Sequence, residues 1–192
     1  GAPVTVILKK AFYQNEAISS VTLPDTVTTI GESAFESCKN LQTVTLSKNL
    51  TAIGDRAFYN DANLKGLALP EGLKRIGDRA FLGDEKLTEI LLPEGMEHVG
   101  DEAFRSCSAL STLTIPAGLT DIGYNAFMHT AWLKARQAED PLVIEGSVLI
   151  NGYNATGEVV IPDTVTVIMG GAFGASDVTD ITIPDSVTRI GY

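Results

Sequence analysis

The chain has 192 residues, of which 44% are hydrophobic and 20% are charged, and its formal net charge at pH 7 is -10. Proteins hold nucleic acids mainly by neutralising phosphates with Lys and Arg, so this acidic balance argues against nucleic acid and anionic membrane surfaces as partners. No apolar run approaches the roughly 18 residues that a membrane-spanning helix needs, and we expect no direct membrane insertion.

A 23-residue unit recurs along the chain and is clearest at residues 69–91. All seven phenylalanines occupy one slot of this unit, and each follows an alanine. The slot is filled, with a double interval before the last member, by Phe12, Phe35, Phe58, Phe81, Phe104, Phe127 and Phe173. A fixed period of this length predicts a solenoid in which each unit buries its apolar face against its neighbours. The phenylalanines are then core residues rather than a stacking platform, and we expect no cofactor.

Residues 1–19 form the end of a first unit, four full units follow from about Val21, and a fifth opens at Leu113. Each unit begins with three residues whose outer members are aliphatic, as in Val44, Thr45 and Leu46. In a short strand this pattern points the first and third side chains inward and the middle one outward. One such strand per coil predicts a parallel sheet along one face of the solenoid.

Turns and a second extended piece complete each unit. Proline ends most of the strands because it lacks an amide donor, and an aliphatic piece ending in Ile-Gly follows, as at Ile30 and Gly31. An acidic residue then opens what we expect to be a single helical turn ending near Ala-Phe. Strands on one face and short helical turns on the other define an α/β fold class.

The acidic slot forms a ladder of carboxylates at Glu32, Asp55, Asp78 and Asp101. One interpretation is a rail for divalent cations, which prefer oxygen ligands. The other is helix N-capping, since Asp accepts hydrogen bonds from the free amides at a helix start. We favour capping, because the sequence does not supply the remaining calcium ligands, and we expect no metal site.

The repeat is interrupted after Phe127 by an enlarged unit at about residues 128–158. Apolar residues at helical spacing predict a helix that extends to about Ala138. Two aliphatic runs around a Glu-Gly turn, at residues 142–144 and 148–150, predict a β-hairpin. The insertion fills one period, so we expect residues 1–192 to form a single solenoid. Trp132 is favoured as core of this unit over a ligand platform.

Both ends of the chain lie inside a repeat, because Gly1 takes a proline slot and Tyr192 follows an Ile-Gly pair. We therefore expect the sequence to be a piece of a longer protein. Cys38 and Cys107 share one slot three periods apart, which places them about 14 Å from each other at strand spacing. That exceeds the roughly 7 Å limit for a disulfide, so both thiols are expected to be buried and unpaired.

Residues suited to catalysis do not form a recognisable motif. The two histidines, His98 and His129, are not at helical spacing from another histidine or a cysteine, and neither Gly-x-Ser-x-Gly nor a phosphate-binding glycine loop occurs. We therefore predict that the chain is not an enzyme.

The outward middle residues of the strands are the candidate partner-binding residues. They are Thr22, Thr45, Ala68, Leu91, Thr114, Val160 and Thr182. Solenoids bind on the broad face that such a sheet makes, and here threonines flank an apolar stretch centred on Ala68 and Leu91, with Glu89, Glu158 and Asp180 beside it. The alternative is that β-branched and aliphatic residues merely suit strands.

These motifs resemble the BspA-type leucine-rich repeat, a bacterial class. Ile-Gly stands at 30–31, 53–54, 76–77, 122–123 and 190–191, Ala-Phe follows the first four of these pairs, and the Cys slot is filled at 38 and 107. Departures are Ser47 for proline, and Met169 and Leu8 for glycine. The resemblance implies a leucine-rich-repeat solenoid with the right-handed crossovers usual for parallel strands.

The resemblance also implies a secreted or cell-surface protein, some relatives being adhesins, with a host or bacterial surface protein or glycan as partner. We favour a non-catalytic recognition module. The alternative is a structural spacer that presents another domain and has no ligand of its own. The sequence determines neither the ligand nor the oligomeric state.

Overall fold

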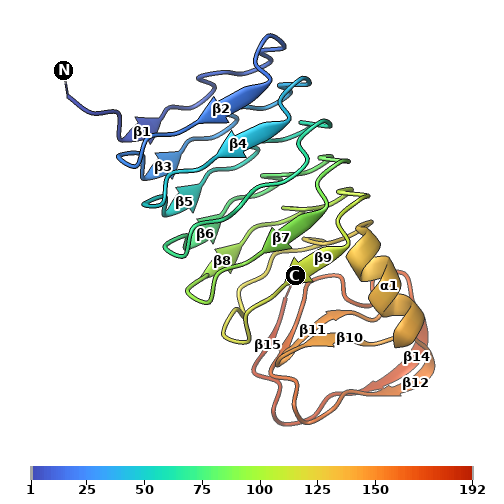
Figure 1. The fold of residues 1–192 in the computed structure, drawn as a ribbon. Helices are drawn as coiled ribbons and strands as arrows, with labels where there is room; N and C mark the ends of the chain where they lie inside the picture. Colours follow the sequence, from blue (N-terminus) through green and yellow to red (C-terminus); the bar gives the residue numbers. More distant parts are fainter. Residues whose placement is uncertain (1, 192) are drawn as a thin grey trace.

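The computed structural model describes residues 2–191 as a stack of parallel coils, with the enlarged unit and two further coils at one end (Figure 1). Gly1 and Tyr192, on which the expectation of a longer protein rests, lie outside the described residues. One face carries a five-stranded parallel sheet of two-residue strands in the order β1-β3-β5-β6-β8. The strands are β1 (Val6–Ile7), β3 (Thr29–Ile30), β5 (Ala52–Ile53), β6 (Arg75–Ile76) and β8 (His98–Val99).

The opposite face of the stack is divided. β2 (Ser20–Thr22) pairs in parallel with β4 (Thr43–Thr45), and β7 (Glu89–Leu91) pairs with β9 (Thr112–Thr114). The coil between these pairs contributes one bridge, Thr43 to Gly66. Within residues 2–191, no ladder joins residues 67–69 to β7. The continuous sheet that the repeat predicts is therefore interrupted between the third and fourth coils.

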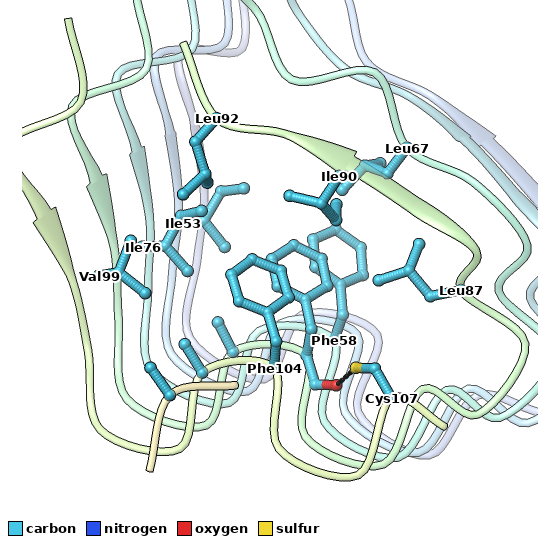
Figure 2. Close-up of a cluster of buried hydrophobic side chains, with 14 of the residues drawn as sticks. Ile53, Phe58, Leu67, Ile76, Leu87, Ile90, Leu92, Val99, Phe104 and Cys107 are labelled. Atoms are coloured by element: carbon cyan, nitrogen blue, oxygen red, sulfur yellow. Dashed lines mark hydrogen bonds between the residues drawn. The ribbon is translucent and has the colours of Figure 1, made fainter. Parts of the chain in front are cut away.

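A column of stacked phenylalanines forms the centre of the core, as predicted (Figure 2). From Phe12 to Phe127 successive ring centroids lie 5.1 to 5.9 Å apart, and the ring planes differ by 3° to 13°. Trp132 closes the column edge-on to Phe127 at 5.8 Å, and its side chain is buried. Its assignment to the core is confirmed. The column fixes the spacing of the coils at close to one strand separation.

The expected helical turns are wrong, because hydrogen-bonded turns replace them. Between residues 31 and 38, alternate amides bond within the coil and across to the next one: Ala34 N donates to Gly31 O, but Phe35 N donates to Ala57 O at 2.7 Å. Ser33 and Ser37 have positive φ, which turns their amides toward the neighbouring coil. In a helix, every interior amide would donate its hydrogen bond to a carbonyl of the same coil. The turns join neighbouring coils by backbone bonds that a helix lacks. The leucine-rich-repeat solenoid itself is confirmed, and its right-handed sense stays a prediction.

The enlarged unit follows the prediction closely. α1 (Ala131–Glu139), the one α-helix of residues 2–191, begins after Thr130, whose hydroxyl accepts a hydrogen bond from Leu133 N. β10 (Val143–Glu145) and β11 (Val148–Asn151) form the antiparallel hairpin. In the described chain α1 is too short and too polar to span a bilayer.

Two small sheets complete the end of the stack. β11 continues in parallel to β13 (Val167–Ile168) and β15 (Arg189–Ile190). β12 (Thr156–Val160) pairs with β14 (Asp177–Thr182). Together they enclose a second apolar cluster that includes Leu149, Val159 and Ile168.

Candidate binding face

The structure places all seven candidate residues on the surface, with exposed side chains. Thr22, Thr45, Ala68, Leu91 and Thr114 follow one another along the divided face described above. Val160 and Thr182 lie on the separate β12-β14 sheet beyond α1 (Figure 1). The candidate residues thus form two patches. We call the first five the main face.

The expected inward residues beside them are buried in the stacked coils, for example Leu23, Val44 and Ile90. In the last strand, Ile181 and Ile183 are 40% and 46% exposed, because no coil of the described chain lies beyond them. The in-out alternation of the strands is therefore confirmed for the interior coils and fails at the last one.

The interruption of the main face forms a groove of ≈ 260 Å³ between the third and fourth coils, here called the Leu91 groove. Leu91 is 51% exposed, unlike the buried Ile90 and Leu92 on either side. The lining consists of Leu67, Ala68, Leu69, Glu71, Glu89, Leu91, Leu92, Pro93 and Glu94. The groove combines a floor of aliphatic side chains with a rim of carboxylates.

The three glutamates of the groove are exposed, and among the described residues none of them forms an ion pair. The nearby Lys74 binds elsewhere, to Glu97 at 3.3 Å and to the Gly95 carbonyl at 3.0 Å. Sequence reasoning noted Glu89 but missed Glu71 and Glu94. The sequence signal for both glutamates was their position directly after Pro70 and Pro93. The turn that begins at each proline follows the strand with the outward residue.

The Leu91 groove admits side chains but not an added strand. On the inner side of the same coils, the rings of Phe58, Phe81 and Phe104 are 5.3 and 5.1 Å apart. A strand inserted between two others needs about twice the 4.8 Å spacing of a sheet. Because the core holds the coils at single spacing, a partner has to lie over the groove.

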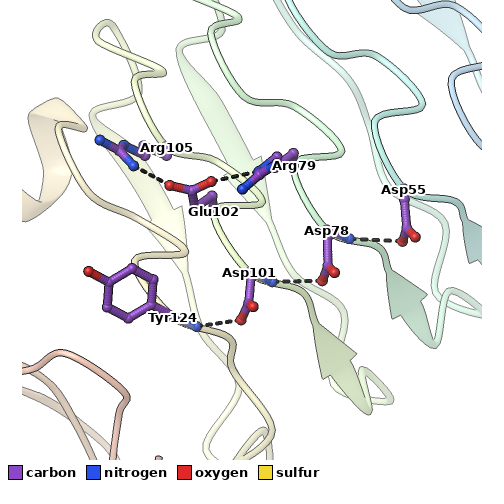
Figure 3. Close-up of polar contacts among 7 residues, drawn as sticks. All are labelled: Asp55, Asp78, Arg79, Asp101, Glu102, Arg105 and Tyr124. Atoms are coloured by element: carbon purple, nitrogen blue, oxygen red, sulfur yellow. Dashed lines mark hydrogen bonds and ion pairs between the residues drawn. The ribbon is translucent and has the colours of Figure 1, made fainter. Parts of the chain in front are cut away.

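The acidic ladder binds backbone amides of the neighbouring coil rather than capping helices (Figure 3). Asp78 Oδ1 accepts from Asp101 N at 2.9 Å, and Asp101 Oδ1 accepts from Tyr124 N at 2.7 Å. Asp55 does the same for Asp78 N, and Glu32 pairs with Lys9. The carboxylates were expected to accept hydrogen bonds from backbone amides, and three of them do. The amides belong to the turn of the neighbouring coil, however, and not to the start of a helix. Within residues 2–191 no group of three or more His, Cys, Asp or Glu side chains is placed to hold a metal.

Beside this ladder, the nearly buried Glu102 lies between two arginines (Figure 3). Arg79 Nε donates to Glu102 Oε2 at 2.6 Å, and Arg105 binds the other carboxylate oxygen. Burial by itself raises the pKa of Glu102, but the hydrogen bonds from the two arginines leave it below its ordinary value. This network connects neighbouring coils and leaves no free carboxylate for chemistry.

One slot of the repeat holds a column of four buried residues, Cys38, Asp61, Asp84 and Cys107, of which the sequence analysis assigned the two cysteines and missed the two aspartates. Both thiols are free and buried, as expected. Asp61 Oδ1 accepts from Cys38 N at 2.7 Å, and Asp84 Oδ1 accepts from Asp61 N at 2.8 Å, but the second oxygen of each carboxyl has no hydrogen-bond partner. Burial raises the pKa of Asp61 to about 8 and that of Asp84 well above its usual range. The common 23-residue spacing was the available signal.

His98 lies in a cleft between β8 and the last two coils. Its Nδ1 is 2.6 Å from Asp121 Oδ2, and Arg189 binds Asp121 and the Thr120 carbonyl from the other side. These contacts join residues 68 and 69 positions apart. His98 and Arg189 thus both bind Asp121, and these contacts connect the coils before the enlarged unit to the last coil after it.

A hollow of ≈ 620 Å³ lies beside α1 and is lined by Met128, Lys134 and Tyr153 among others. Its polar side chains include Ser108 and His129 from the turns and Gln137 from α1. Gln137 is already bound to Asn151 at 2.7 Å. This hollow therefore gives weaker grounds for a ligand than the Leu91 groove.

The chain belongs to the family described as BspA type leucine-rich repeat region. It matches that family in six copies, over residues 5–134 and 144–192. The unmatched stretch between these two ranges, residues 135–143, covers the second half of α1 and the link to β10, within the enlarged unit. No curated protein matches the chain.

Solved structures share the fold over nearly the whole chain. A leucine-rich cell surface protein from Faecalibacterium prausnitzii is 28% identical with a TM-score of 0.68, over 98% of this chain and 61% of the other. The T. pallidum leucine-rich repeat protein is 24% identical with a TM-score of 0.63, over 100% and 68%. The pneumococcal vaccine antigen PcpA is 24% identical with a TM-score of 0.65, over 98% and 52%. This chain thus spans from about half to two thirds of these relatives, and at the two lower identities the likeness concerns the fold.

Proposed function

We propose that this chain is a non-catalytic recognition module of a secreted or cell-surface bacterial protein, and that it holds its partner on the main face. The observation that carries the proposal is the Leu91 groove, where a half-exposed leucine lies beside Ala68 on a face whose other outward strand residues are threonines. Exposed apolar surface of this kind is typical of a contact site.

The surface location and an adhesin-like role are supported by analogy. The F. prausnitzii relative is described as a cell surface protein and PcpA as a vaccine antigen. Fold alone does not define function, so the assignment depends on the face and its chemistry. The competing proposal, a spacer arm without a ligand, is supported by the regular stacking of the coils and predicts no partner for the main face.

The test is binding of the chain to a panel of immobilised surface proteins and glycans at physiological salt, beside two variants. Leu91→Glu places a charge in the groove. Leu8→Glu is the matched control, since Leu8 is 71% exposed and lies in the first coil outside the main face. Circular dichroism establishes that all three forms are folded.

Saturable binding that Leu91→Glu abolishes and Leu8→Glu retains is the expected result. Binding that both variants retain would remove the main face from consideration. If no panel member binds the folded chain, the spacer becomes the better description.

A further inference from the structure

We propose that the partner is a protein that lays a basic, extended segment over the Leu91 groove, with an aliphatic side chain against Leu91 and a Lys or Arg on either side of it. The proposal rests on the proposed function and specifies the partner's chemistry. Glu89 at one end of the groove and Glu71 and Glu94 at the other end would receive the two cations.

The first argument is unneutralised charge. Several exposed carboxylates on other parts of the stack form ion pairs, for example Glu32 with Lys9, Asp25 with Lys48 and Glu97 with Lys74. Among the described residues, none of the three glutamates of the groove forms an ion pair, although they share one small hollow, and the nearby Lys74 is bound to Glu97. Such a local excess of one sign favours a partner of the opposite sign and speeds its association.

The second argument is hydrogen-bond type. The only polar side chains lining the groove are carboxylates, which accept hydrogen bonds and donate none. The side chains of Lys and Arg donate and do not accept, so they match this lining. A neutral glycan presents hydroxyls that both donate and accept, and an anionic glycan would be repelled. The groove also has no aromatic side chain on which a sugar ring could stack.

The third argument is spacing. Glu89 and Leu91 alternate with the buried Ile90 along β7, so their side chains point to the same side about 7 Å apart. An extended segment with the sequence Arg-x-Leu-x-Arg has the same two-residue period. Its leucine then meets Leu91 and Ala68, while its arginines reach the glutamates at the two ends.

The probe is the peptide acetyl-Gly-Arg-Thr-Leu-Thr-Arg-Gly-amide, titrated into the isotope-labelled chain and followed by NMR. Two control peptides carry Glu for both arginines or Ser for the leucine. We expect saturable shifts confined to amides around Ala68, Leu69 and Leu91 for the first peptide, weakened about tenfold or more by either replacement. Binding also weakens when NaCl rises from about 0.05 M to about 0.5 M.

The protein variants separate local from global charge. The triple variant Glu71→Gln, Glu89→Gln, Glu94→Gln removes the rim and should reduce affinity about tenfold. A second triple variant, Glu16→Gln, Glu85→Gln, Glu158→Gln, removes the same number of exposed charges away from the groove and should change affinity by less than about twofold.

Three results would overturn the proposal: equal binding of the Glu-containing peptide, equal loss in the two triple variants, or shifts that lie away from the groove. A panel protein that binds through Leu91 while the Arg-containing peptide fails to bind would contradict this inference and leave the proposed function standing. Peptide binding as expected, with no panel member bound, would support this inference and direct the search to other basic proteins.

Discussion

Replacing the two buried aspartates by asparagine should remove a pH dependence of stability. Asp61 and Asp84 are fully buried, lie one coil apart, and form no ion pair with a residue in the described range 2–191. In each carboxyl group, one oxygen accepts a hydrogen bond from a backbone amide and the other oxygen has no hydrogen-bond partner. Asn at either position keeps the accepting oxygen and cannot ionise. The double variant Asp61→Asn, Asp84→Asn therefore removes two ionisable groups with little change in side-chain shape.

The direction of the effect follows from the raised pKa values. An unfolded aspartate has a pKa near 3.9, whereas burial raises that of Asp61 to about 8 in the folded chain, and that of Asp84 well above its usual range. Between these values the folded state holds a proton that the unfolded state has released, so the free energy of unfolding falls as the pH rises. Each carboxyl contributes a slope of about 1.4 kcal/mol per pH unit.

For Asp61, whose pKa is raised to about 8, the predicted loss between pH 5 and pH 7 is about 2–3 kcal/mol, and Asp84, whose pKa is also raised, adds to the loss in the same direction. This is a large fraction of the total stability of an ordinary domain. Glu102, whose pKa is lowered, behaves oppositely: its contribution is lost only as the pH falls below the unfolded value, outside this window. Burial also raises the pKa of the nearby Cys38 thiol, to about 11, which lies above this pH window.

Urea unfolding followed by circular dichroism at pH 5, 6, 7 and 8 measures the slope. The unfolding free energy of the wild-type chain should fall across the series, that of each single variant less steeply, and that of the double variant least. Asp55→Asn, which removes an exposed carboxylate, is the control and should retain the wild-type slope. Parallel curves for the wild type and the double variant would refute the reasoning.

Three further predictions concern packing and backbone contacts, each measured by urea unfolding. Phe81→Ala, within the stacked column, should lower the free energy of unfolding by about 3–5 kcal/mol. Phe12→Ala, at a residue that is 37% exposed, should lower it by about half as much. Equal losses would contradict a core role for the column. Asp101→Ala removes the acceptor of Tyr124 N and should cost about 1 kcal/mol more than Asp101→Asn. Gly123→Ala should cost about 3 kcal/mol, because the added Cβ would lie 2.4 Å from Asp101 N; a neutral result would show that the coils can separate locally.

The sequence was sufficient for the architecture because a repeat reveals which slots are buried. Phe81 and Ile90 could be assigned to the core from their period alone, and the hairpin from its turn residues. The helical turn was wrong since its apolar spacing fits both a helix and a turn whose alternate amides bond across coils. Positive φ at residues such as Ser33 distinguishes the two, and few of the equivalent residues, such as Asn60, Asn125 and Gly83, are of types that favour that conformation.

The candidate site was predicted in part. Leu91 and Ala68 were assigned to the surface from strand alternation, which the structure confirms. The groove between them depends on the absence of a ladder between two neighbouring coils, and residue patterns do not report that separation. Asp61 and Asp84 were overlooked because aspartate is seldom buried without a partner, although their slot is the one that holds the cysteines.

The phenylalanine column also determines how the chain would respond to a pulling force. Each coil adds only 5.1 to 5.9 Å to the height of the stack, yet it contains 23 residues, which stretch to about 75 Å when unravelled. A coil detached from the end would lengthen the molecule by roughly 70 Å while the remaining coils kept their packing. Held between a cell and a surface under flow, such a stack would extend in coil-sized steps, limiting the tension on whatever contact the intact coils maintain.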